Sequence, residues 1–247
     1  MIPTAESLQG KAVPKVTFKA RPDDQWRDIT TDELFNGKTV VVFSLPGAFT
    51  PTCSSTHLPG YNELAGVFKD NGVDDIVCLS VNDAFVMNEW KAGQEADSIT
   101  LIPDGNGDFS EGMGMLVDKR ALGFGQRSWR YSMLVKDGII DKVFIEPEQE
   151  GDPFEVSDAD TMLAYINPDA KRPQPVVMFS KPGCPHCARA KAVLRDNNVR
   201  FTDISQDKTI NTSVLMAVSG DMTWPQVFIG GKLIGNADAV EAHFSKG

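Results

Sequence analysis

Four cysteines are the residues of this chain best suited to redox chemistry, and they fall into two groups. Cys53 and Cys78 lie in the N-terminal half of the 247 residues, whereas Cys184 and Cys187 form a Cys-x-x-Cys pair near the other end. In a chain with few cysteines and no signal peptide, cysteines more often act as reactive thiols than as structural disulfides. The sequence therefore predicts two thiol centres.

Cys53 follows a pattern that predicts a strand, a turn and the start of a helix. Residues 39–44 are rich in β-branched side chains, residues 46–53 form the turn, and Pro51 suits the first position of a helix. Unpaired backbone N–H groups and the helix macrodipole stabilise a thiolate there. Cys53 is thus predicted to be a nucleophile at neutral pH, with the Thr50 hydroxyl in reach of the sulfur.

The Cys184-Pro-His-Cys187 pair also follows a predicted strand and opens a helix, beside Lys181. Such a pair combines an attacking thiol that ionises readily with a partly buried partner. A structural zinc ion would need two further ligands, and this part of the chain offers only His186 and His243. We therefore predict a dithiol centre and no metal site.

Alternating strands and helices in both parts of the chain predict an α/β fold. In the N-terminal part, the predicted strands are residues 39–44, 75–81 and 131–135, with a helix over residues 54–69. In the C-terminal part, strands are predicted at 176–179, 200–204 and 226–229, and helices at 187–197 and 238–244. Each part is expected to carry a sheet covered by helices.

Residues 167–175 contain three prolines in nine positions and predict a stiff, solvated linker. The predicted domains are therefore residues 1–166 and 176–247, with the linker at 167–175 between them. The charges divide unequally, because residues 1–174 hold 16 Lys and Arg against 28 Asp and Glu, whereas residues 175–247 hold 8 against 6. The large domain is strongly acidic and the small one slightly basic.

The net charge of −10 and the lack of a basic patch argue against a nucleic-acid partner. The N-terminal residues have neither a basic start nor an apolar core, and no run of 18 apolar residues follows. We therefore expect a cytoplasmic protein without a membrane partner.

The segments 46–54 (PGAFTPTCS) and 127–131 (RSWRY) resemble the peroxiredoxin 5 family, and the resemblance covers roughly residues 3–165. It implies a thioredoxin-like fold in which Cys53 is the peroxidatic cysteine, oxidised to a sulfenic acid. It also implies that Thr50 orients the peroxide, Pro46 shields the sulfur, and Arg127 pairs with the thiolate and the peroxide oxygen.

Two neighbouring residues have alternative interpretations. Arg130 either supports the same site or only solvates its strand. His57, one helical turn after Cys53, either forms a Cys–His pair or has a capping or packing role, and we favour the latter.

Family members that resolve the sulfenic acid internally carry a second cysteine late in this domain, but residues 146–154 (EPEQEGDPF) contain none. Cys78 lies in an apolar strand pattern, where a cysteine usually behaves as a small hydrophobic residue. The sulfenic acid at Cys53 is therefore expected to need a thiol from outside the domain.

The C-terminal part resembles glutaredoxin in the segments 181–187, 223–226 (TWPQ) and 230–238 (GGKLIGNAD). The resemblance implies a cis-proline loop, with Cys184 as nucleophile and Cys187 as its partner. The implied glutathione site is lined by Lys181, Thr223, Trp224, Pro225, Ala237 and Asp238. Trp224 has the alternative interpretation of a packing residue. His186 departs from the dipeptide usual between the two cysteines of glutaredoxins, which leaves the reduction potential of the pair open.

These features predict a fusion of two thioredoxin-like domains, an N-terminal peroxiredoxin-like domain and a smaller C-terminal glutaredoxin-like domain. Its expected activity is the reduction of hydrogen peroxide and alkyl hydroperoxides, with glutathione as cosubstrate and no tightly bound cofactor. Because the linker is short, we expect delivery between neighbouring subunits of a homo-oligomer. The alternatives are a general thiol–disulfide oxidoreductase and a peroxide sensor.

Overall fold

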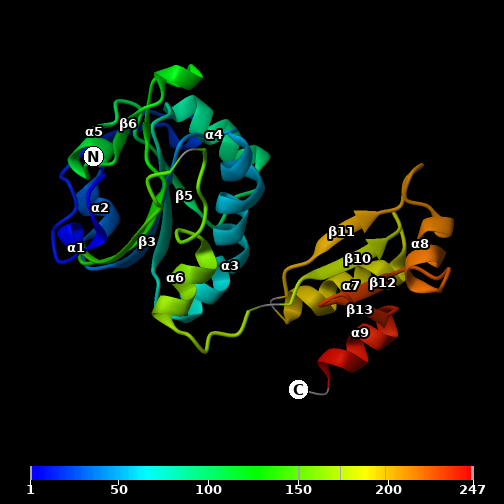
Figure 1. The fold of residues 1–247 in the computed structure, drawn as a ribbon. Coiled ribbons are helices and arrows are strands. Elements are labelled where there is room, and N and C mark those ends of the chain that lie inside the picture. The colour runs from blue at the N-terminus through cyan, green and yellow to red at the C-terminus, as the bar shows by residue number, and fades with distance from the viewer. Residues whose placement is uncertain (1, 150, 173, 198, 246–247) are drawn as a thin grey trace. The chain divides into compact units, whose positions relative to one another are not determined.

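The chain folds into two compact units, Met1–Arg172 and Pro173–Gly247, called the large unit and the small unit below. The structure is a computed structural model that describes residues 2–149, 151–172, 174–197 and 199–245. The division falls inside the predicted linker 167–175, of which Pro173 lies outside the described residues. Figure 1 shows each unit as a sheet with helices packed on it.

The large unit is built on a five-stranded sheet with the strand order β5-β4-β3-β8-β9. Its strands are β3 (Thr39–Leu45), β4 (Asp75–Ser80), β5 (Thr100–Pro103), β8 (Tyr131–Lys136) and β9 (Ile139–Ile145). Strands β3, β4 and β5 are parallel, whereas β8 and β9 add an antiparallel hairpin at the other side of β3. The three strands predicted for this part are present.

Alternating side chains of the central strand β3 enter two separate cores, as expected for a strand that is buried on both faces. Val41, Phe43 and Leu45 pack into the core under the helices η2 (Cys53–His57), α3 (Leu58–Asp70), α4 (Ala84–Gly93) and α6 (Ala159–Ile166). Val40 and Val42 belong to the core on the opposite face. That face is covered by α1 (Ala5–Leu8), α2 (Thr31–Phe35) and α5 (Asp108–Gly112).

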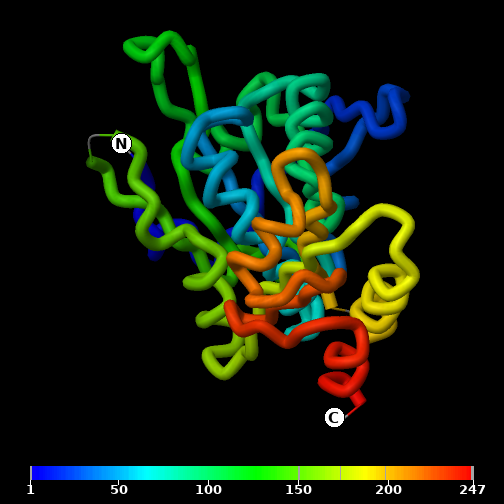
Figure 2. The backbone as a smooth tube through the Cα atoms, turned by 90° about the vertical axis from the view of Figure 1, so that its right-hand side faces the viewer, coloured from blue at the N-terminus to red at the C-terminus, as the bar shows by residue number. Residues whose placement is uncertain are grey.

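Short elements complete the large unit, and none of them was predicted. They are β1 (Thr17–Ala20), η1 (Pro22–Asp24), β2 (Arg27–Thr30), β6 (Leu116–Asp118), η3 (Arg120–Leu122) and β7 (Gln126–Ser128). The antiparallel pair β6 and β7 projects away from the main sheet, as the green loop at the top of Figure 2 shows. Its second strand leads directly into β8.

The small unit carries a four-stranded sheet with the order β11-β10-β12-β13. Its elements are β10 (Val176–Ser180), α7 (Pro185–Asp196), β11 (Thr202–Ser205), α8 (Thr212–Ser219), β12 (Gln226–Ile229), β13 (Lys232–Gly235) and α9 (Ala237–Phe244). Strand β11 is parallel to β10, and β12 and β13 are antiparallel to their neighbours. All five predicted elements are present, whereas α8 and β13 were missed.

Candidate active sites

Cys53 lies at the first turn of the helix that follows β3, as predicted, but this turn is a π-turn. The π-turn η2 (Cys53–His57) runs directly into α3, and the Ser54 N–H donates to the Thr50 carbonyl at 3.0 Å. π-turns within helices occur frequently at functional sites. The side chain of Cys53 is completely buried.

The loop before Cys53 is held by the neighbouring strand end. Phe49 adopts a left-handed φ of 64°, which is uncommon for a residue other than glycine. The Ala48 N–H donates to Oδ1 of Asn82 at 3.0 Å, and that oxygen also accepts the Ser80 hydroxyl at 2.7 Å. Asn82, which the sequence analysis did not single out, thus fixes the loop to the end of β4.

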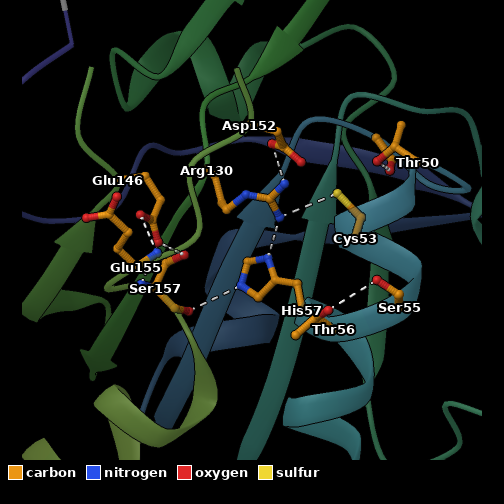
Figure 3. Close-up of polar contacts among 11 residues, drawn as sticks. Thr50, Cys53, Ser55, Thr56, His57, Arg130, Glu146, Asp152, Glu155 and Ser157 are labelled. Atoms are coloured by element: carbon orange, nitrogen blue, oxygen red, sulfur yellow. Dashed lines mark hydrogen bonds and ion pairs between the residues drawn. The ribbon is translucent and has the colours of Figure 1, made fainter. Parts of the chain in front are cut away.

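Arg130 is the guanidinium that contacts the sulfur of Cys53. Its Nη1 donates to Cys53 Sγ at 3.5 Å and to Nδ1 of His57 at 3.0 Å (Figure 3). Its Nη2 forms an ion pair with Asp152. Because the Arg130 side chain is almost completely buried, it is a site residue and does not merely solvate its strand.

His57 is a neutral positioning group rather than a base for Cys53. Burial, followed by the positive charge of Arg130, lowers its pKa well below the usual 6.5. The neutral ring accepts from Arg130 at Nδ1 and therefore donates from Nε2 to the carbonyl of Ser157 at 3.2 Å. Both nitrogens are occupied, so the packing role is favoured over a Cys–His pair.

The carbonyl that holds His57 is itself fixed by a buried carboxylate. Glu146 accepts from the backbone N–H groups of Glu155, Val156 and Ser157 and from the Ser157 hydroxyl. The Ser157 carbonyl also accepts the hydroxyl of Tyr61 at 2.8 Å. A chain of hydrogen bonds therefore runs from Glu146 through Ser157 and His57 to the Arg130 guanidinium, which contacts the sulfur of Cys53.

The structure corrects the predicted pairing of Arg127 with the thiolate. Arg127 Nη1 donates to the carbonyl of Val81, and its Nε lies close to Gly47. Arg127 therefore lies beside the loop before Cys53, whereas Arg130 contacts the sulfur. The two arginines are three residues apart, and sequence alone gave no means to rank them.

The other residues predicted around Cys53 lie on that loop. Thr50 donates its hydroxyl to the Gly47 carbonyl at 2.8 Å, which leaves its oxygen lone pairs free to accept. Pro46 is half-buried at the start of the same loop. Their roles toward a peroxide stay predictions.

Cys78 lies in the core of the sheet. It is completely buried on β4, opposite Phe43 of β3. Burial, and next the nearby thiol of Cys53, raises its pKa well above 9.0. An un-ionised, inaccessible thiol fits the predicted core role.

In the small unit, Cys184 caps the start of α7 and Cys187 lies one turn later. The Cys187 N–H donates to Cys184 Sγ at 3.3 Å, and the Lys181 N–H donates to Cys187 Sγ at 3.4 Å. Burial opposes ionisation of Cys184, but hydrogen bonds from Cys187 and the positive charge of Lys181 outweigh it and lower its pKa. Burial, and next the neighbouring Cys184 sulfur, raises the pKa of Cys187 to about 11. Cys184 is therefore the better nucleophile of the pair.

The predicted glutathione residues lie on three segments of the small unit, at Lys181 before α7, at 223–225 and at the start of α9. The Trp224–Pro225 bond is cis, as the resemblance implied, and the Trp224 carbonyl lies 3.8 Å from Cys184 Sγ. Trp224 also packs against the core, so its packing role is present. The neighbouring Thr223 is held by the side chain of Gln226, whose Nε2 donates to its carbonyl and hydroxyl.

Ala237 and Asp238 begin the helix α9. Ala237 is buried, and Asp238 is exposed and paired with Arg189 of α7. The carboxylate of Asp238 is thus already engaged in the structure. Ligand binding at these residues stays a prediction.

Among the described residues, no group of three or more His, Cys, Asp and Glu side chains is arranged to hold a metal ion. No helix in the described ranges is long and apolar enough to cross a membrane. The cellular compartment stays a prediction of the sequence.

Comparison with known proteins places both units in established families. The Redoxin family model matches residues 8–163, and the Glutaredoxin model matches residues 176–234. The hybrid peroxiredoxin hyPrx5 of Haemophilus influenzae is 59% identical over 97% of this chain and 99% of its own length. Peroxiredoxin sll1621 of a Synechocystis species is 60% identical over 62% of this chain and 88% of its own.

Solved structures resemble the large unit. Reduced Prx3 from Vibrio vulnificus in complex with hydrogen peroxide is 42% identical, with a TM-score of 0.60. That match covers 64% of this chain and 98% of the other. Together with the geometry around Cys53 and Cys184, these findings show that the chain belongs to the redoxin family as a peroxiredoxin, a thiol peroxidase, fused to a glutaredoxin domain.

Proposed function

We propose that the chain is a glutathione-dependent peroxidase for hydrogen peroxide and alkyl hydroperoxides, in which Cys184 helps to restore Cys53. The observation that supports this most strongly is the isolation of Cys53. Cys78 is completely buried, and residues 146–154 contain no cysteine. The oxidised Cys53 therefore needs a thiol from outside the large unit. The Cys184 pair on the same chain is suited to thiol–disulfide exchange with such a thiol.

In the first step, the Cys53 thiolate attacks the terminal oxygen of the hydroperoxide. The S–O bond forms as the O–O bond breaks, the leaving alkoxide takes a proton to become an alcohol or water, and Cys53 becomes a sulfenic acid. Arg130 faces this reaction with a fixed positive charge, since His57 and Asp152 hold its guanidinium against the sulfur. A preorganised charge stabilises both the thiolate and the negative leaving oxygen.

Reduction then passes through glutathione. One glutathione condenses with the sulfenic acid to give a mixed disulfide and water. The Cys184 thiolate attacks the glutathione sulfur, which releases Cys53 as a thiolate and leaves glutathione on Cys184. A second glutathione regenerates Cys184 and yields glutathione disulfide. This route uses Cys184 alone, so Cys187 is dispensable for it.

The test is peroxide-dependent NADPH oxidation by the full chain with glutathione and glutathione reductase, and with no other thiol protein. We expect sustained turnover, no turnover in Cys53→Ser, and a loss on the order of tenfold or more in Cys184→Ser because the tethered reductant is removed. Cys187→Ser is the matched control in the same motif and should retain most of the activity.

Each other result points away from the proposal. A single stoichiometric burst would indicate a sensor or an external protein reductant. Reduction of insulin disulfides without peroxide consumption would indicate a general thiol–disulfide oxidoreductase. Equal loss in Cys184→Ser and Cys187→Ser would mean that the cycle runs through a dithiol step.

A further inference from the structure

The ion pair between Arg130 and Asp152 differs from the other ion pairs in the described part of the chain. The Arg130 side chain is 2% exposed, whereas that of Asp152 is 43% exposed. In the other pairs, the cation is at least 25% exposed. Asp152 is thus the solvent-facing charge at an otherwise buried site.

One guanidinium joins Asp152 to the reacting sulfur. Nη1 of Arg130 donates to Cys53 Sγ, and Nη2 of the same group donates to Oδ1 of Asp152. Figure 3 shows Asp152 and Cys53 attached to this guanidinium through separate dashed contacts. Because the two nitrogens share one carbon atom, an oxidant that reaches the sulfur meets a guanidinium that also carries the Asp152 carboxylate.

The charged groups that contacts join to the sulfur sum to one negative charge, and Arg127 makes its contact with the Val81 carbonyl instead. The Cys53 thiolate and Asp152 carry one negative charge each, and Arg130 supplies one positive charge between them. An uncharged hydroperoxide can accept hydrogen bonds at this site without electrostatic repulsion. An anionic peroxide is repelled by the net negative charge. The negative field of the chain as a whole acts in the same direction, but it is spread over many groups.

We propose that Asp152 is a specificity-determining residue that makes Cys53 selective for uncharged hydroperoxides over anionic peroxides. This inference deepens the proposed function and rests on its peroxide half alone. Glutathione and the small unit take no part in the discrimination.

The test compares hydrogen peroxide, which is neutral at pH 7, with peroxymonosulfate, which is an anion. With the anion, the Cys53 thiolate takes the terminal OH, the O–O bond breaks, sulfate leaves, and the same sulfenic acid forms. The reduced full chain is mixed with each oxidant, quenched by alkylation, and analysed by mass spectrometry of the Cys53 peptide. This readout is independent of oxidation at the other cysteines.

The measured quantity is the rate constant for the anion divided by that for hydrogen peroxide. Asp152→Asn is expected to raise this ratio by roughly tenfold, because it removes one unit of negative charge from the guanidinium that contacts the sulfur. Asp152→Ser is a second neutral variant and should raise the ratio by a similar factor. It provides the test if Asp152→Asn folds poorly. Asp152→Glu retains the charge and should keep the ratio.

Glu148→Gln is the matched control, because it removes one exposed carboxylate from the same segment, whereas the ion pair of Arg130 is with Asp152. It should leave the ratio unchanged. If the neutral variants lower both rate constants in parallel, Asp152 only holds Arg130 in place and the inference is wrong. An unchanged ratio, or an equal rise in Glu148→Gln, overturns it as well. A chain in which Cys53 reacts with neither oxidant would instead contradict the proposed peroxidase.

Discussion

At the scale of single residues, the chemistry around Cys53 depends on a guanidinium that three groups hold. Arg130 contacts the sulfur, His57 and Asp152 at once, so its position is fixed before a peroxide arrives. Such preorganisation is most effective in the transition state, where charge develops on the leaving oxygen. The second arginine, Arg127, contacts the backbone of Val81 instead.

Replacement of the two arginines by lysine should separate these roles. Arg130→Lys removes the fork that spans the sulfur and Asp152, and we expect the second-order rate constant of Cys53 with hydrogen peroxide to fall about 100-fold or more. Arg127→Lys should cost less, because no contact with the sulfur is lost. Stopped-flow or quenched-flow oxidation measures both, and a larger loss in Arg127→Lys would contradict the assignment.

The neutral state of His57 predicts how the stability of the large unit depends on pH. Its pKa is well below 6.5 in the folded chain, and 6.5 is the value expected after unfolding. Below pH 6.5 the unfolded chain binds a proton that the folded chain does not, so His57 favours unfolding as the pH falls. Its contribution should lower the free energy of unfolding by up to about 1.4 kcal/mol per pH unit.

This dependence can be measured by urea unfolding between pH 7.5 and 5, with tryptophan fluorescence in a Trp224→Phe background. The remaining tryptophans, Trp26, Trp90 and Trp129, all lie in the large unit. His57→Gln should be less stable at pH 7.5 and should have a slope smaller by about one proton. Equal slopes in both proteins would show that His57 is not the group that titrates.

The sequence analysis assigned the contact with the sulfur to Arg127 instead of Arg130 for a physical reason. Both lie in one short segment of mixed polarity, and the contact with Cys53 spans 77 positions of the chain. Only the packing of β8 against β3 determines which side chain reaches the sulfur. Asp152 gave no signal at all, since it is one of several acidic residues in one segment, and such residues normally face solvent.

At the scale of elements, the site is assembled where the helix after β3 meets the segment after β9. The π-turn η2 supplies Cys53 and His57, the start of β8 follows Arg130, and the segment from Glu146 to Ser157 closes the arrangement. The long buried strands were predictable because β-branched runs bounded by turns have few alternatives. The short strands β1, β2, β6 and β7 were missed, since they are half-exposed and too short for a period.

Glu146 should couple the segment after β9 to the reactivity of Cys53. The Glu146 carboxylate accepts hydrogen bonds from three backbone N–H groups, and in Glu146→Gln an amide NH₂ must face at least one of these donors. We therefore expect a loss of about 1–3 kcal/mol in the stability of the large unit. Because Ser157 would shift with it, Cys53 oxidation by hydrogen peroxide should also slow. Denaturant unfolding and quenched-flow oxidation measure the two effects, with Glu148→Gln as the charge-matched control. Full stability in Glu146→Gln would contradict the bonding pattern.

At the scale of the whole molecule, an acidic large unit is joined to a slightly basic small one. Residues 1–174 carry a formal net charge of about −12, and residues 175–247 carry about +2. Opposite charges favour encounter between proteins, and salt screens them over about 10 Å at 0.1 M. The docking of the units during recycling is therefore expected to be electrostatic.

Turnover with glutathione should accordingly fall as salt rises from about 50 to 500 mM. The coupled NADPH assay measures this, with glutathione reductase in excess and checked at each salt concentration. The oxidation of Cys53 in a single turnover serves as the control, since it needs no docking and should fall less. A flat turnover profile would mean that the charge difference serves solubility alone.

The complete burial of Cys53 limits the rate of the proposed catalytic cycle. In the proposed cycle glutathione must form a disulfide with Cys53, but a tripeptide thiol cannot reach an atom that has no exposed surface. The turn from Cys53 to His57 must therefore open, breaking the contact to Arg130 and the bond between Trp90 and Ser54. Each cycle then contains one local unfolding event, and the frequency of that opening sets an upper limit on turnover that added glutathione cannot raise.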